Sequence, residues 1–119
     1  MSPKVFMRII NKTKNTILAE DAIVANTPFQ RIKGLLGKKE FKQGQALILK
    51  PCNSVHTFFM CFPIDVLFVN KDNTVIEAIP NLKPFCLTYI YFNATSAIEL
   101  PPGTIQYSLT SKGDTILLE

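Results

Sequence analysis

Residues Asn53–Asn70 read NSVHTFFMCFPIDVLFVN, and this apolar stretch decides the fold class. It predicts two neighbouring strands, Val55–Met60 and Ile64–Val69, joined by a tight turn. Both faces of the first strand are largely apolar, as in a central strand that is covered on both sides. His56 and Asp65 are the polar exceptions in this predicted core, so a function is expected to lie at these two residues.

Further candidate strands are separated by turn-forming sequences such as NKDN, PNLKP and PPG. They are Val5–Ile10, Ile17–Ala25, Ala46–Lys50, Val75–Ile79, Leu87–Phe92, Ala97–Leu100 and Thr115–Leu118. The chain has 119 residues and no visible linker, so residues 1–119 are expected to form a single domain with a substantial core. The expected fold class is mainly β: a compact antiparallel β-sandwich or barrel-like domain.

One short α-helix is predicted at residues 28–36. Thr27 is a suitable N-cap, Pro28 occupies the favoured first helical position, and Gly37 follows as a stop signal. A second helical turn is predicted at Thr104–Ser108.

The composition is that of an ordinary globular protein, with 47% hydrophobic and 18% charged residues. The formal net charge is +4, but the basic residues are dispersed along the chain, which favours a solvated surface over a specific nucleic-acid interface. The first residues match neither a signal peptide nor a membrane span, so a cytoplasmic protein is expected.

The three cysteines and the single histidine match the ligand inventory of a zinc site, but their spacing does not. Cys52, His56, Cys61 and Cys86 form no closely spaced ligand pair such as C-x₂-C. Strand alternation also places His56 and Cys61 on opposite faces, which argues against a Cys–His nucleophile unless the segment at Cys52 folds back. We therefore expect no metal, no cofactor, and buried, unreactive thiols.

Four ordered motifs resemble the DUF192 family of small bacterial and archaeal proteins. They are RIKGLLG, HTFFMCFPIDVLFVNKDNTVI, AIELPPGTI and KGD, and the resemblance as a whole covers roughly Ile17–Leu118. The resemblance implies a compact, mainly β fold with a short helix, in a family of no established biochemical activity.

The family pattern also singles out individual positions in this chain. They are Arg31, Gly34, Leu35, His56, Thr57, Phe59, Met60, Pro63, Ile64, Asp65, Phe68, Glu99, Leu100, Gly103, Gly113 and Asp114. Relatives that the chain resembles carry an arginine where it has Cys61 and a Trp-Arg pair where it has Phe85-Cys86. If those arginines bind an anion, this chain lacks both.

The polar residues of that pattern lead to two hypotheses of function. We favour a non-enzymatic binding or interaction module, with Arg31, His56, Asp65 and Glu99 as binding residues and an unknown small ligand or protein as partner. The alternative is a small hydrolase or acid–base enzyme that uses His56 with Asp65 or Glu99. A buried Asp65 needs a donor, and we expect a bidentate pair with Arg31 rather than bonds to His56 or to backbone N–H groups.

Overall fold

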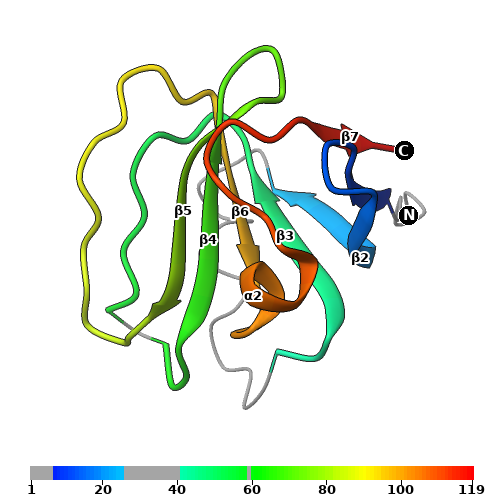
Figure 1. Ribbon diagram of the computed structural model, residues 1–119. Coiled ribbons are helices and arrows are strands. Elements are labelled where there is room, and N and C mark those ends of the chain that lie inside the picture. The colour runs from blue at the N-terminus through cyan, green and yellow to red at the C-terminus, as the bar shows by residue number, and fades with distance from the viewer. Residues whose placement is uncertain (1–6, 26–40, 59) are drawn as a thin grey trace, which may run out of the picture.

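The computed structural model describes residues 7–25, 41–58 and 60–119, which form one curled β-sheet and a short helix (Figure 1). The strands, in chain order, are β1 (Met7–Asn11), β2 (Thr16–Ala25), β3 (Gly44–Leu49), β4 (Ile64–Val69), β5 (Val75–Leu82), β6 (Ser96–Leu100) and β7 (Ile116–Leu118). The helix is α2 (Thr104–Ser108), at the position predicted for the second helical turn. The mainly β fold is confirmed, whereas the helix predicted at residues 28–36 lies outside the described residues.

The strands are arranged in the order β5-β4-β6-β3-β2-β1-β7. All neighbouring pairs are antiparallel except β2 and β3, which run parallel. A parallel pair needs a connection of a dozen or more residues, and the chain between β2 and β3 is long enough to supply one. The sequence analysis expected antiparallel strands and did not predict this pair.

Alternating residues divide the core between the two faces of the sheet. On one face, Ile48, Leu67 and Leu100 pack with Ile105 of α2, and we call this the helix face. On the other, Val66 and Phe68 of β4 and Leu47 of β3 pack with Val55, which precedes β4, and we call this the loop face. Strand β4 is buried along its whole length because side chains cover both faces.

The described residues of the predicted strand Val55–Met60, which are 55–58 and 60, do not pair with β4. Val55 and Thr57 are buried and His56 and Phe58 are exposed, so the alternation is correct, but the bridge found among these described residues pairs His56 with Leu87. Thr57 explains this pairing, since its backbone N–H donates to the carbonyl oxygen of Cys86 (2.9 Å) and its hydroxyl to that of Lys83 (2.6 Å). The predicted hairpin between the two halves of the stretch is therefore wrong.

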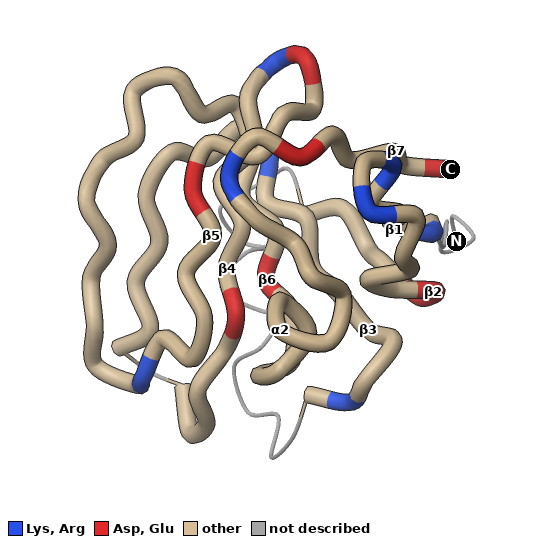
Figure 2. Tube along the Cα trace, viewed as in Figure 1, with Lys and Arg blue, Asp and Glu red and all other residues tan. Residues whose placement is uncertain are grey.

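Residues 50–58 and 83–95 form two extended segments at the side of the molecule beyond β5 (Figures 1 and 2). The predicted strand Leu87–Phe92 lies in the second segment and is irregular, with a bridge only at Leu87.

Candidate functional site

Asp65 lies on the helix face, fully buried near the start of β4. Its Oδ1 accepts a hydrogen bond from the backbone N–H of Asn81, and its Oδ2 accepts one from the backbone N–H of Ile105, both at 2.8 Å. The N–H of Asn81 is available because the pairing of β4 with β5 is interrupted at this point and Asn81 has a positive φ of 53°. The N–H of Ile105 is available because the first turn of a helix has no internal acceptors.

The carboxylate of Asp65 therefore ties β4 to β5 and to α2. No side chain caps α2, since its N-cap is Gly103, and Asp65 supplies an acceptor from 40 residues away in sequence. Backbone N–H groups are the donors that the sequence analysis ranked below Arg31, which lies outside the described residues. These contacts account for the burial of Asp65 without a ligand.

Glu99 occupies the middle of the sheet on the loop face. Its strand, β6, lies between β3 and β4, where Glu99 is the register partner of Leu47 and of Val66. Its exposed fraction is only 6%. Within the described residues, the carboxyl group of Glu99 forms no hydrogen bond and no ion pair.

Burial raises the pKa of Glu99 from 4.5 to about 7. No nearby positive charge or hydrogen bond offsets this desolvation in the described part of the chain. Buried polar groups are nearly always paired and an unpaired one costs stability, which makes Glu99 a candidate functional residue.

Half-buried apolar side chains border the cluster of the loop face. Phe41, Met60 and Phe62 pack against it, and the ring centroids of Phe41 and Phe62 are 6.4 Å apart. Leu47 and Val66, the register partners of Glu99, belong to this cluster, so Glu99 has apolar neighbours.

His56 lies in the extended segment of residues 50–58, and its side chain is exposed rather than part of the buried core. Its ring stacks on Phe58 with centroids 5.2 Å apart. Among the described residues, it forms no hydrogen bond or ion pair with Asp65 or Glu99. The structure thus does not bring the three described site residues into one bonded group. The sequence analysis placed His56 in a predicted core, whereas its side chain is exposed.

The cysteines are more accessible than the sequence analysis expected. Cys61 is exposed, and Cys52 and Cys86 are half-buried. The expectation of three buried thiols is therefore wrong, because the segments that carry them lie at the surface rather than in a central strand. Across residues 7–25, 41–58 and 60–119, no three His, Cys, Asp or Glu side chains are grouped as a metal site would require.

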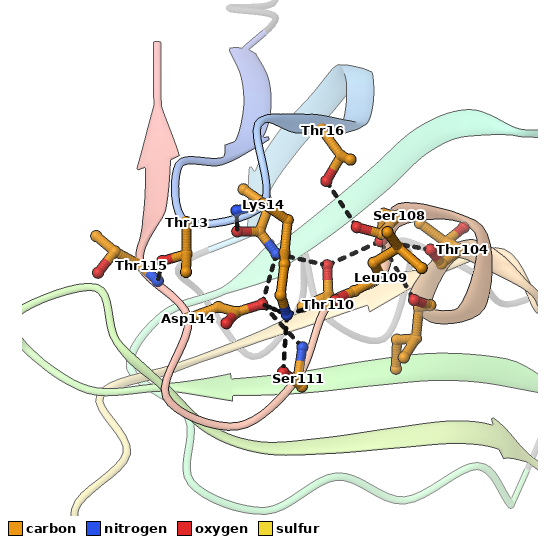
Figure 3. Close-up of polar contacts among 12 residues, drawn as sticks. Thr13, Lys14, Thr16, Thr104, Ser108, Leu109, Thr110, Ser111, Asp114 and Thr115 are labelled. Atoms are coloured by element: carbon orange, nitrogen blue, oxygen red, sulfur yellow. Dashed lines mark hydrogen bonds and ion pairs between the residues drawn. The ribbon is translucent and has the colours of Figure 1, made fainter.

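A polar network that the sequence analysis missed joins the β1–β2 turn to the segment after α2 (Figure 3). Oδ2 of Asp114 accepts hydrogen bonds from Nδ2 of Asn11 (2.8 Å), Nζ of Lys14 (2.9 Å) and the backbone N–H of Ser111 (3.0 Å). Asn11, fully buried, donates a second bond to Thr110 at 3.0 Å. The sequence analysis named Asp114 through the family pattern and gave no role to Asn11 or Lys14.

The charge of Asp114 is stabilised by this network. Burial alone would raise the pKa of Asp114, but the hydrogen bonds from Asn11, Lys14 and Ser111 and the positive charge of Lys14 outweigh it and lower the pKa. Because its polar groups are paired with one another, the network is structural, in contrast to the isolated Glu99.

A family model described as "Uncharacterized ACR" matches residues 9–118. The chain belongs to the DUF192 family. Its curated relatives include a UPF0127 protein of Thermococcus sibiricus, 30% identical over 91% of this chain and 72% of the relative, and one of Pyrococcus horikoshii, 28% identical over 91% and 96%.

Two solved structures share the DUF192 fold at low sequence identity. A proposed transcription regulator of Sinorhizobium meliloti has a TM-score of 0.78 at 20% identity, with 98% of each chain covered. A protein of unknown function from Novosphingobium aromaticivorans has a TM-score of 0.80 at 18% identity, covering 96% of this chain and 84% of the other. At such identities the likeness supports the fold alone.

Of the positions singled out by the DUF192 pattern, the described ones have distinct roles. Gly103 and Gly113 both have φ of +95°, as predicted for turn glycines. Asp65 and Asp114 hold elements together, and Glu99 is buried without a hydrogen bond or ion pair to any described residue. No helix in the described residues is long and apolar enough to cross a membrane.

Proposed function

We propose that this DUF192 protein is a non-enzymatic binding module whose ligand contacts Glu99 on the loop face. The observation that carries the proposal is the burial of a carboxyl group that no described residue pairs with. An enclosed acid without a partner destabilises the fold, and a ligand that donates a hydrogen bond or brings a positive charge removes that cost.

The proposed site takes in the four residues that the sequence indicated, in different roles. Glu99 is the acceptor at its centre, and Arg31 and His56 are candidates for further polar contacts. Asp65 contributes by fixing β4, the strand next to Glu99, because both its oxygens already accept backbone hydrogen bonds.

The ligand chemistry follows from Glu99 and from the loop-face cluster, which contains its register partners Leu47 and Val66. Phe41, Met60 and Phe62 pack against that cluster and offer apolar contact, and the carboxyl group offers one charged acceptor. The matching ligand has an apolar body and an ammonium or other donor group, either as a small molecule or as a side chain of a protein partner.

Thermal-shift measurements with three related probes test the proposal. Phenethylammonium, phenethyl alcohol and 3-phenylpropionate share an aromatic body and differ in charge. Phenethylammonium is expected to raise the melting midpoint most and 3-phenylpropionate least, because ligands that bind only the folded state stabilise it by mass action.

Glu99→Gln should abolish the preference for the cation. Glu20→Gln is the matched control, since Glu20 is exposed on β2 and its loss changes the net charge equally. Equal midpoint shifts for the three probes, or an unchanged preference in Glu99→Gln, would refute the proposal.

The raised pKa of Glu99 favours one alternative, a hydrolase or other acid–base enzyme that uses this carboxyl group. A general acid or base works best with a pKa near the operating pH, and about 7 meets that condition. Turnover of an ester or amide substrate that is lost in Glu99→Gln and follows a pKa near 7 would establish this alternative over simple binding.

A cytoplasmic location and the lack of a sequence-specific nucleic-acid partner belong to the same proposal. The exposed thiol of Cys61 suits a reducing compartment, and the dispersed basic residues provide no clustered phosphate contacts.

A further inference from the structure

The segment of residues 83–95 is hydrogen-bonded to the rest of the protein along one side. The backbone N–H groups of Thr88 and Tyr91 donate to the carbonyl oxygens of Val55 (2.9 Å) and Asn53 (2.8 Å). On the same stretch, the backbone N–H groups of Leu87, Tyr89 and Ile90 donate to no described residue. The segment therefore presents an unpaired backbone edge, like the edge strand of a sheet.

Large apolar side chains are exposed along the same segment. Phe85, Tyr89 and Phe92 are 77%, 84% and 85% exposed, and Leu87 and Ile90 are also more than half exposed. Together they expose about 700 Å², given roughly 200 Å² for each side chain of this size. Monomeric proteins rarely expose apolar patches larger than about 600 Å².

Charged residues are missing from this part of the sequence. Residues 84–98 contain no Asp, Glu, Lys or Arg, nor do residues 51–64, which pair with them through His56 and Leu87. Figure 2 shows both outer segments without charge along these stretches. Natural edge strands are usually protected against pairing by charged side chains, and this edge lacks that protection.

We propose that residues 85–92 form the interface of a homodimer, in which the edges of two copies pair about a two-fold axis. The exposed area of about 700 Å² sets the upper limit of what one chain can bury at this edge, and that limit is close to the roughly 800 Å² per partner of a stable interface. Two copies that each carry a charge of +4 repel one another least where neither is charged, which is this edge. A two-fold axis brings identical uncharged edges together, antiparallel, as β-sheet pairing allows.

Sedimentation equilibrium of the full chain tests the dimer. We expect a mass of twice 13.4 kDa at micromolar concentrations and a monomer on dilution. Leu87→Lys and Tyr89→Lys should each weaken the dimer about 100-fold, since like charges meet across the two-fold axis. Both positions are exposed, and unchanged melting midpoints of the diluted monomers would show that the variants fold.

Ile17→Lys is the matched control, because Ile17 is an exposed apolar residue on β2 outside the segment. Ile17→Lys should leave the dimer intact. Glu99→Gln should leave it intact as well, so a failure of the dimer proposal can be distinguished from a failure of the proposed ligand site. A wild-type protein that remains monomeric at 100 µM, roughly a hundred times the expected dissociation constant, would overturn the inference. A dimer unaffected by the two edge lysines would overturn it as well.

Discussion

Asp65 and Glu99 lie on the neighbouring strands β4 and β6, but their carboxyl groups are on opposite faces of the sheet. Asp65 is the register partner of Leu100 and Glu99 that of Val66, so consecutive positions alternate between the faces. Asp65 accepts two backbone hydrogen bonds, whereas Glu99 has no partner among the described residues. Two buried acids on adjacent strands therefore have different roles, one in the architecture and the other at the proposed site.

Asp65→Asn is expected to lower the free energy of unfolding by about 1–3 kcal/mol. The amide has one acceptor oxygen, so at least one of the N–H groups of Asn81 and Ile105 loses its bond, and an unsatisfied buried donor costs about 1–3 kcal/mol. Urea unfolding measures the change. Asp72→Asn, in the exposed β4–β5 turn, is the control, and its free energy of unfolding should stay within about 0.5 kcal/mol of the wild-type value. An Asp65→Asn protein as stable as this control would contradict the anchor role.

Stability should fall between pH 5 and pH 8 because of Glu99. Its pKa is raised in the folded state, so the folded protein holds a proton that the unfolded chain releases above an ordinary value of 4.5. The resulting penalty is absent below that pH, grows as pH rises through about 7, and reaches about 3 kcal/mol at 1.36 kcal/mol per pKa unit.

Glu99→Gln should remove this pH dependence and be more stable than the wild type at pH 8. Denaturant unfolding at several pH values compares it with Glu20→Gln. A wild-type stability that is flat from pH 5 to pH 8, or a slope that persists in Glu99→Gln, would show that Glu99 is not the group responsible.

Asp114 should act in the opposite direction, at acid pH. Its pKa is lowered in the folded state, so it stabilises the fold above the unfolded value of about 3.9, and this contribution disappears as pH falls through the lower folded value. Asp114→Asn should therefore be less stable than the wild type by about 2–3 kcal/mol at pH 7, with the difference shrinking below pH 4. Thermal unfolding from pH 2 to pH 7 measures the difference, and a constant gap across that range would disagree with the account.

Much of the sheet can be predicted from local pattern, because burial leaves a signature in the sequence. The bounds of β4, Ile64–Val69, agree with the prediction, since a continuous apolar run between turn residues is typical of a strand covered on both faces. The alternation of residues 55–58 is equally visible, but alternation does not name a partner. Residues 55–58 pair with residues 86–88 rather than with β4 because the backbone N–H of Thr57 donates to Cys86 and its hydroxyl to Lys83, both distant in sequence.

For the site residues too, the local sequence pattern identifies the residue but not its distant partner. Sequence reasoning identified Asp65 and Glu99 as notable acids and required a donor for Asp65. It favoured Arg31 over backbone groups, because the open N–H groups of Asn81 and Ile105 arise from a strand irregularity and a helix start that no local pattern connects to Asp65. The isolation of Glu99 depends on which strands flank β6, and the parallel β2–β3 pair that sets part of this order was not predicted.

An NMR titration of the side-chain carboxyl carbon of Glu99, with and without phenethylammonium, tests the central claim most directly. The account predicts a midpoint at about pH 7 for the protein alone, because the group is buried without a partner. Saturation with phenethylammonium should move that midpoint to lower pH, because an adjacent cation favours the ionised carboxylate. A midpoint near 4.5 in the free protein, or one that the probe leaves unchanged, would contradict the proposal that Glu99 is a buried acceptor awaiting a ligand.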